Sequence, residues 1–218
     1  MTGVTVVITS FNRLDLLKRT VDSFNKMNTY PVAGIILIED SGIPEVHAEL
    51  RQQYPHFHLI LNEKNIGAYE SIDKAYSLVT TPYVFHTEDD WEYVLPSFIE
   101  PSVEILENDK MLMQTWLSNT EGCSIYPEIL KAGKTEYRIA GPDKDNFWHG
   151  FTCHPGLRSM EGYRRTAPWT QWINKSDPLS VQECTVGEAY YRLGYKAAVL
   201  NDIYCKHIGL GRCTWHEN

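Results

Sequence analysis

The 218-residue sequence has no long hydrophobic run. Its longest apolar stretches have the length of a β-strand, far short of the roughly 18 consecutive apolar residues that mark a membrane-spanning helix. Met1-Thr2-Gly3 leads directly into a strand-like segment, without the apolar core of a signal peptide. From these absences we expect no transmembrane segment and a cytoplasmic location. The 43% of hydrophobic residues can still build the core of one domain.

Positive charge is also scarce. Lys and Arg number 20 against 28 Asp and Glu, a formal net charge of -8. This balance argues against nucleic acid as a partner, because phosphate backbones select basic surfaces. The five cysteines include no C-x-x-C pair, so we expect reduced thiols rather than a zinc site.

Two nucleotide-binding signatures are missing as well. The turn after the first predicted strand has no G-x-G-x-x-G, which argues against a Rossmann-type dinucleotide site. Gly133-Lys134-Thr135 resembles the end of a phosphate-binding loop, but Glu128 stands where that loop needs its first glycine.

The first half of the chain instead alternates strand and helix patterns. Apolar, β-branched runs predict four buried strands, and apolar residues at helical spacing predict helices between them. The strand runs are 4–9, 35–38, 57–61 and 83–85. Continuous apolar strands of this kind indicate a parallel sheet covered on both faces. Residues 111–117 are a candidate fifth strand, and the second half adds the short runs 197–200 and 203–206.

A polar cluster follows each of the four predicted strands. The clusters are 9–13, 39–41, 65–67 and 88–90. Ligands of open parallel sheets bind in the crevice outside the carboxyl ends of the strands. We therefore expect these four segments to converge at one rim of the sheet.

The last cluster, Glu88-Asp89-Asp90, places three adjacent carboxylates at the end of an apolar strand. Their mutual repulsion is unfavourable unless a cation or hydrogen-bond donors compensate it. Hard oxygen ligands suit Mg²⁺ or Mn²⁺, and Mg²⁺ usually binds through one or two carboxylates plus substrate phosphates. A solvated acidic turn that caps the next helix is the alternative.

In order and spacing, the four clusters resemble the nucleotide-binding half of family 2 glycosyltransferases with the GT-A fold. The segments that carry the resemblance are 4–13, Glu39-Asp40-Ser41-Gly42, Asn65-Ile66-Gly67 and Glu88-Asp89-Asp90. The resemblance implies one α/β domain over 1–218, with a Rossmann-like, mostly parallel central sheet flanked by helices. Residues 1–115 would bind the nucleotide sugar, and residues 116–218 would form a smaller acceptor-binding half.

The resemblance also implies which residues contact the nucleotide. Phe11 would stack on the base, Arg13 would offer a planar donor, and Asp40 would accept the N3–H of a uracil or thymine ring, which makes UDP the expected nucleotide. Gly67 would allow a close backbone approach. Structural alternatives are a core position for Phe11 and an Asx-turn for Asp40. The full set assigned to the nucleotide is Thr9, Phe11, Arg13, Asp40, Asn65, Gly67, Glu88 and Asp89.

For the metal, the family pattern Asp-x-Asp is matched here by Glu88-Asp89-Asp90. The resemblance makes Asp90 the direct ligand of Mn²⁺ or Mg²⁺, with Asp89 or Glu88 on the ribose or on a metal-bound water. The glutamate at position 88 leaves that division open. His207 resembles a C-terminal histidine that reaches the metal or diphosphate in many GT-A enzymes, and a purely structural histidine is the alternative. The metal would neutralise charge on the departing diphosphate.

Transfer also needs a base for the acceptor hydroxyl. In the family this carboxylate precedes a helix with an arginine and a terminal glycine. Gln182-Glu183 stands before a predicted helix that ends at Gly194, so the resemblance assigns the base to Glu183. Glu188 and Asp177 remain competitors. A glutamate favoured at a helix N-terminus by the macrodipole is the structural alternative.

The second half is rich in aromatic residues, which suits a wall that binds a saccharide or lipid-linked acceptor. Core packing is the default explanation for each of them. A lipid-linked acceptor would bring the chain to a membrane surface, although no basic amphipathic helix marks such a contact. The candidates are Trp148, Phe151, Trp169 and Trp172 for the sugar face, and Asn146 and His149 for hydroxyl groups.

The resemblance thus implies a metal-dependent inverting glycosyltransferase that uses a nucleotide-diphosphate sugar. Two alternatives remain open. A non-catalytic nucleotide-sugar-binding module is supported only by the departures at Glu88 and Gln182. A sugar-phosphate nucleotidyltransferase lacks its expected glycine-rich, basic loop after the first strand.

Overall fold

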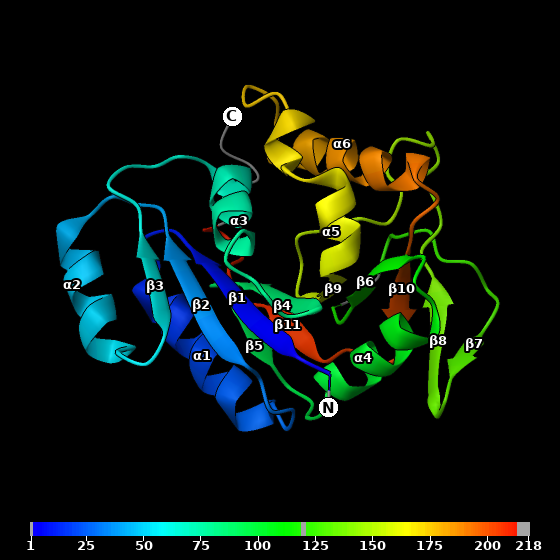
Figure 1. The fold of residues 1–218 in the computed structure, drawn as a ribbon, viewed down its shortest axis with the longest axis horizontal. Coiled ribbons are helices and arrows are strands. Elements are labelled where there is room, and N and C mark those ends of the chain that lie inside the picture. Colours follow the sequence, from blue (N-terminus) through cyan, green and yellow to red (C-terminus); the bar gives the residue numbers. More distant parts are fainter. Residues whose placement is uncertain (1, 119–120, 213–218) are drawn as a thin grey trace.

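The structure, a computed structural model, describes residues 2–118 and 121–212. At its centre lies a nine-stranded sheet with the spatial order β3-β2-β1-β4-β9-β6-β10-β8-β7 (Figure 1). The first four strands in this order are parallel neighbours: β3 (His58–Leu61), β2 (Gly34–Glu39), β1 (Val4–Ser10) and β4 (Tyr83–Glu88). They are the four strands predicted from the apolar runs of the first half.

The other strands of this sheet come from the second half of the chain. They are β6 (Leu112–Trp116), β7 (Leu130–Ala132), β8 (Thr135–Ile139), β9 (Gly156–Ser159) and β10 (Lys196–Leu200). β9 is antiparallel to its neighbours β4 and β6, whereas β6 and β10 are parallel. β8 is antiparallel to β10 and β7. The sheet is therefore mostly parallel, as the resemblance implied, with β9 and β8 reversed.

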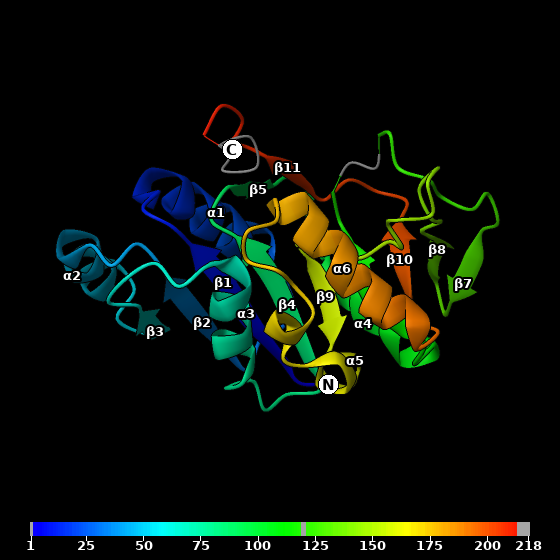
Figure 2. The same ribbon diagram turned by 90° about the horizontal axis from the view of Figure 1, so that it is seen from above.

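Helices cover both faces of the sheet, which explains the continuous apolar strands. Along β1, Val4, Val6 and Ile8 join one apolar cluster and Val7 joins the other, because successive strand side chains alternate. The first cluster includes side chains of α1 (Leu14–Met27), α2 (Pro44–Gln53) and α4 (Ile99–Asn108), and the second those of α3 (Ala68–Tyr76), α5 (Met160–Thr166) and α6 (Leu179–Arg192). Figure 2 shows α1 and α3 on opposite sides of the strands.

A two-stranded antiparallel sheet places residues 205–207 beside the segment that follows β4. β5 (Trp91–Tyr93) pairs with β11 (Cys205–His207), so that His207 lies opposite Trp91. The Val94 N–H donates to the Tyr204 carbonyl at 2.8 Å and extends this pairing. The predicted strand at 203–206 is thus present but begins two residues later.

Several elements differ from the sequence prediction, which contained none of the strands β5, β7 and β8 and neither of the helices α4 and α5. β9 was not predicted, because its four residues include only one large apolar side chain, Leu157. α6 begins at Leu179, so Glu183 lies inside the helix, and our placement of Glu183 ahead of the helix was wrong. Its first turn contains Leu179 and Val181, but the first buried positions are Gln182 and Glu183, so the apolar spacing indicated the helix only from Val186 onward. A short 3-10 helix, η1 (Trp169–Gln171), connects α5 to the loop before α6.

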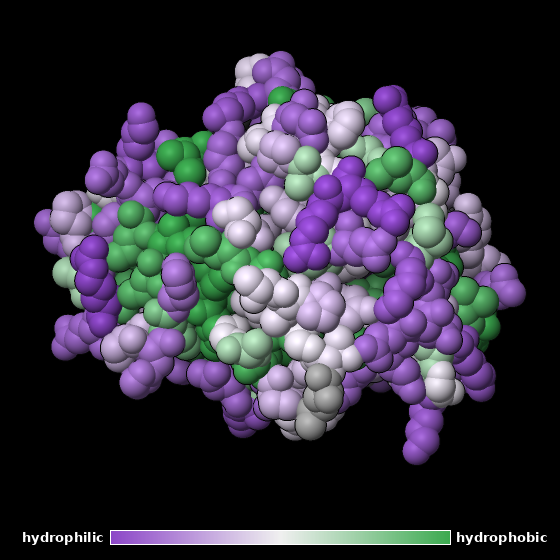
Figure 3. Space-filling model, viewed as in Figure 1, coloured by the Kyte–Doolittle hydropathy of each residue, from purple (hydrophilic) through white to green (hydrophobic). Residues whose placement is uncertain are grey.

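In the described part of the chain, no helix is both long and apolar enough to cross a membrane. Cys123, Cys153, Cys184 and Cys205 are free thiols, whereas Cys213 lies outside the described residues. The face in Figure 3 is mainly hydrophilic over α6 and the β7–β8 hairpin and carries an apolar area near β2 and β3.

Candidate active site

The polar clusters after β1, β2 and β4 lie in direct contact at one rim of the sheet. The Phe11 N–H donates to Asp89 Oδ2 at 3.0 Å, which joins the first cluster to the acidic triplet. The Asn12 N–H donates to Glu39 Oε1 at 2.9 Å, which joins the same turn to the end of β2. Asn12 has a positive φ of 51°, which turns the chain sharply after β1. The convergence expected from the sequence is therefore present.

Asp40 ties the end of β2 to the loop before α3. Its carboxylate accepts hydrogen bonds from Asn62 Nδ2 at 2.8 Å, the Gly67 N–H at 2.9 Å and the Ile66 N–H at 3.0 Å. Gly67 has a φ of 104°, which favours glycine, and it caps α3. These bonds fix the loop that contains Asn65, whose side chain is exposed. A contact between Asp40 and a base ring would use the lone pairs that these bonds leave available.

Arg13 faces the acidic triplet. Its Nη1 lies 2.7 Å from Asp90 Oδ2, its Nε lies 3.2 Å from Asp89 Oδ2, and a further guanidinium nitrogen forms an ion pair with Asp89. The Arg13 cation thus pairs with two of the three carboxylates. This pairing offsets the repulsion between adjacent carboxylates that the sequence indicated. Thr9 is half-buried, and Phe11 is 40% exposed, so the Phe11 ring can stack on a planar ligand.

The three carboxyl groups have different surroundings. Asp89 is fully buried, and burial raises its pKa to about 6. Burial and the charge of Asp90 together raise the pKa of Glu88 to about 8. Burial acts in the same direction on Asp90, but a hydrogen bond with His207 and the charge of Arg13 hold the pKa of Asp90 below its ordinary value. Asp90 is therefore the member of the triplet that ionises most readily.

Asp90 and His207 form the candidate metal site. His207 Nε2 lies 3.1 Å from Asp90 Oδ2, and Asp90 Oδ1 is buried without a hydrogen-bond partner among the described residues. Mg²⁺ and Mn²⁺ accept carboxylate ligands and complete their shells with water and phosphate oxygens. Over residues 2–118 and 121–212, no group of three or more His, Cys, Asp or Glu side chains is arranged to hold an ion. Asp90 and His207 could supply two ligands to a cation whose other ligands are water and diphosphate oxygens.

The segment after β11 packs directly on this site. The Ile208 N–H donates to the Asp90 carbonyl at 2.8 Å. A Cβ at Gly209 would lie 2.3 Å from Asp90 Oδ2, so a larger residue would displace the carboxylate. Arg212 forms two hydrogen bonds with the Asp15 carboxylate, at 2.7 and 3.0 Å. The role of Gly209 was not foreseen, because a glycine after a strand carries no signal of what packs against it.

Glu183 projects from α6 into a buried setting. Its Oε2 accepts a hydrogen bond from the Cys153 N–H at 2.7 Å, and the Thr152 side chain also bonds to it. Burial raises the pKa of Glu183 to about 7, which suits a general base near neutral pH. The charge of Glu183 contributes to the raised pKa of Glu88, so the two carboxyl groups lie within electrostatic reach of each other.

The two competing carboxylates have different environments from that of Glu183. Glu188 pairs with Arg192 Nε at 2.8 Å and with His149 Nε2 at 2.8 Å, and the Arg192 hydrogen bond lowers the pKa of Glu188. Asp177 lies in the loop before α6 and is only half-buried. Neither is enclosed as Glu183 is.

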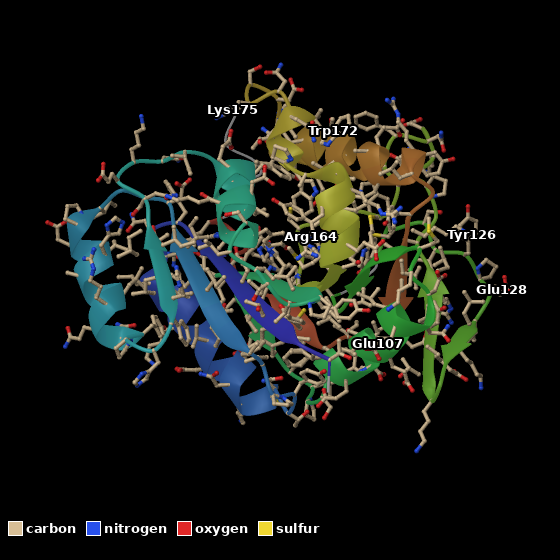
Figure 4. All side chains as sticks on the ribbon, in the orientation of Figure 1. Glu107, Tyr126, Glu128, Arg164, Trp172 and Lys175 are labelled. Atoms are coloured by element: carbon tan, nitrogen blue, oxygen red, sulfur yellow. The ribbon has the colours of Figure 1, made fainter. Side chains whose placement is uncertain are left out.

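The aromatic residues assigned to an acceptor wall divide into two groups. Phe151 and Trp169 are 1% and 0% exposed and pack in the core between the sheet and α3, α5 and α6, so our assignment of these two to an acceptor surface was wrong. His149 is also buried and stacks on Tyr191, with ring centroids 3.9 Å apart. Trp172 is 44% exposed and lies near α6 in Figure 4. The candidates that reach the surface are Trp148, Trp172 and Asn146.

The model of the family described as glycosyl transferase family 2 matches residues 5–169. The match includes β1 to β4, the acidic triplet and β9, so it covers the converged rim described above. The chain belongs to glycosyltransferase family 2.

Two solved structures share the fold over nearly the whole chain. A mannosyltransferase, PcManGT from Pyrobaculum calidifontis in complex with GDP-Man and Mn²⁺, has a TM-score of 0.67 at 15% identity and covers 98% of this chain and 59% of its own. GalNAc-T7 with UDP, GalNAc and Mn²⁺ has a TM-score of 0.69 at 14% identity and covers 94% and 43%. Both are GT-A glycosyltransferases, and this chain has the GT-A fold.

Among curated proteins, the chain is similar to beta-1,4 N-acetylgalactosaminyltransferase 1. It is 31% identical to the Rattus norvegicus protein and 29% identical to the Homo sapiens protein over 104 residues. Each match covers 48% of this chain and 18% of the relative, so the chain spans only a fraction of the length of these relatives.

Proposed function

We propose that this chain is a divalent-metal-dependent inverting glycosyltransferase that moves a sugar from a UDP-linked donor to an acceptor hydroxyl. The Asp90 carboxylate carries the proposal. It has one buried oxygen without a partner among the described residues, and its other oxygen lies beside His207 and Arg13. Family membership and the Mn²⁺-bound fold relatives support the same reading.

Mn²⁺ or Mg²⁺, when bound, would neutralise the negative charge that develops on the departing diphosphate. Asp90 and His207 would hold the cation, and Arg13 would keep the buried Asp89 in place next to Asp90. Phe11 would stack on the base, and Asp40 and Gly67 would border it. UDP is favoured because a carboxylate at the Asp40 position can accept the N3–H of a uracil ring.

Glu183 would act as the base in a single displacement. The acceptor oxygen attacks the anomeric carbon, the bond from that carbon to the diphosphate oxygen breaks, and its electron pair leaves with the diphosphate. The acceptor proton moves to the Glu183 carboxylate, whose raised pKa suits this transfer. The acceptor would be a saccharide or a lipid-linked sugar that approaches from the side of Trp148 and Trp172.

A thermal-shift panel tests the proposal, because a ligand that binds the folded state raises its apparent stability. UDP with Mn²⁺ should raise Tm, UDP or Mn²⁺ alone should raise it less, and Asp90→Asn should abolish the combined effect. Absence of a shift with every nucleoside diphosphate would overturn the proposal. A larger shift with GDP would replace the uridine assignment. Mn²⁺-dependent UDP binding without release of UDP from any nucleotide sugar would instead indicate a non-catalytic binding module.

A further inference from the structure

Arg158 is a charged residue in the middle of the sheet. It lies on β9, between β4 and β6, and is 2% exposed. In the described part of the chain, no carboxylate forms a salt bridge with it, although burial of a guanidinium is strongly unfavourable without good partners. An apolar side chain of similar length would fill the same space without this cost, so the charge calls for a reason other than packing.

The guanidinium is held by neutral acceptors and by two aromatic faces. Nη1 donates to the Tyr76 hydroxyl at 2.7 Å, and Nη2 donates to the Thr152 carbonyl at 2.8 Å. The guanidinium carbon lies 5.4 Å from the ring centroid of Phe151 and 5.7 Å from that of Trp169. These contacts fix the orientation of the planar fork and direct one donor at the Thr152 carbonyl.

The same peptide group contacts Glu183 on its other side. The Thr152 carbonyl and the Cys153 N–H belong to one peptide unit, and that N–H donates to Glu183 Oε2 at 2.7 Å. The Thr152 side chain bonds to Glu183 as well. Hydrogen bonds in such a chain polarise one another, so a cation on the carbonyl strengthens the donor that faces the carboxylate.

We infer that Arg158 is a positioning residue for the reaction: through the Thr152–Cys153 peptide it orients the Glu183 carboxylate toward the acceptor hydroxyl. This inference rests on the proposed function, in which Glu183 is the base. The Arg158 charge reaches Glu183 through this fixed, polarised peptide group and also directly, where it opposes the rise that burial causes in the pKa of Glu183.

The test uses release of UDP from UDP-N-acetylgalactosamine, with UDP affinity measured separately by calorimetry in Mn²⁺. Arg158→Met should lower kcat by roughly 100-fold, the size of effect that a misplaced catalytic group produces, and leave UDP affinity unchanged. Arg158→Lys, which keeps the charge, should recover part of kcat. Arg164→Met is the matched control, because Arg164, labelled in Figure 4, belongs to α5 and is exposed, and this variant should match the wild type.

A double variant separates positioning from general damage. In the Glu183→Gln background, Arg158→Met should cause no further loss of kcat, because the group it orients is already disabled. An additional loss there, or wild-type kcat in Arg158→Met alone, would overturn the inference. If Arg158→Met does not fold, Tyr76→Phe answers the same question, because it removes the hydroxyl that holds Arg158 Nη1 and leaves Glu183 and the Thr152–Cys153 peptide unchanged. A wild-type kcat in Tyr76→Phe would then overturn the inference.

Failure of the proposed function gives a different pattern. If the wild-type chain neither binds UDP with Mn²⁺ nor releases UDP from a donor, the proposed function fails. If it does both and Glu183→Gln retains full kcat, the base assignment fails. A loss of kcat in Glu183→Gln together with a normal Arg158→Met rejects only the role of Arg158.

Discussion

His207 Nε2 lies 3.1 Å from Asp90 Oδ2, although the two residues are 117 positions apart. The β5–β11 pairing produces this contact, because it sets His207 opposite Trp91, next to the acidic triplet. The candidate metal site therefore combines Asp90, from the segment after β4, with His207, from β11.

His207→Ala should weaken Mn²⁺-dependent UDP binding by about tenfold or more, since even the residues that only orient metal ligands contribute on this scale. Calorimetric titration with UDP at fixed Mn²⁺ measures the change. His56→Ala is the control, because His56 is exposed in the segment before β3. Equal affinities in the two variants would remove His207 from the metal site.

Gly209→Ala should impair the same site through steric displacement. The added Cβ would lie 2.3 Å from Asp90 Oδ2, so the carboxylate or the C-terminal segment has to move. We expect a clear loss of the Tm increase produced by UDP and Mn²⁺. Gly34→Ala is the matched control, because nothing lies within 4 Å of a Cβ there. A normal thermal response in Gly209→Ala would show that the segment after β11 does not shape the site.

Donor turnover should depend on pH through Glu183. A base works only when it is ionised, and burial raises the pKa of Glu183 to about 7, so kcat/KM should rise with pH through about 7. Glu88, whose pKa is raised to about 8 by burial and by Asp90, titrates nearby. The profile should therefore also be recorded for Glu88→Gln, where the rise near 7 should persist. A flat profile between pH 5.5 and 8.5 would contradict the base assignment.

Stability should show the opposite pH trend for the same residue. The folded-state pKa of Glu183, about 7, lies above the ordinary value of 4.5. The stabilising contribution of its neutral form is complete below pH 4.5 and is lost as pH rises through about 7. Glu183→Gln stays neutral, so at pH 8 its free energy of unfolding should exceed that of the wild type by about 3 kcal/mol.

Urea unfolding at pH 4.5 and pH 8 measures this difference. The gain of Glu183→Gln should vanish at the lower pH, where the wild-type carboxyl is also neutral. Glu188→Gln, on the same helix but partly exposed, should show no such gain at pH 8. A Glu183→Gln variant that is less stable than the wild type at pH 8 would show that the folded protein favours the ionised carboxylate.

The parallel part of the fold was readable from the sequence because each of its strands is buried on both faces. Val4 and Val6 pack in one apolar cluster and Val7 packs in the other. Because both faces of the strand are buried, successive positions all need apolar side chains, and the run is continuous. The polar residues after these strands then follow from the geometry of parallel sheets, which brings carboxyl ends to one rim. This is why the contacts of Phe11 with Asp89 and of the first turn with Glu39 could be anticipated in outline.

The second half was less readable because its contacts are set by distant partners. β9 is short and contains the charged Arg158, whose burial depends on Tyr76 and on the loop at Thr152. The aromatic residues gave a misleading signal, because a buried Trp169 and an exposed Trp172 look alike in composition. The helix that holds Glu183 begins at Leu179, but the first residues that it buries are Gln182 and Glu183, so apolar spacing indicated the helix only from Val186 onward.

The place of β9 has a consequence for protein engineering. Although it comes from the half of the chain assigned to the acceptor, it is inserted beside β4, the strand that leads into the acidic triplet. Cutting or exchanging the chain near residue 115 would leave β4 with an open edge on that side. A chimera that swaps acceptor preference should therefore retain Gly156–Ser159 from this chain and replace only the segments around it.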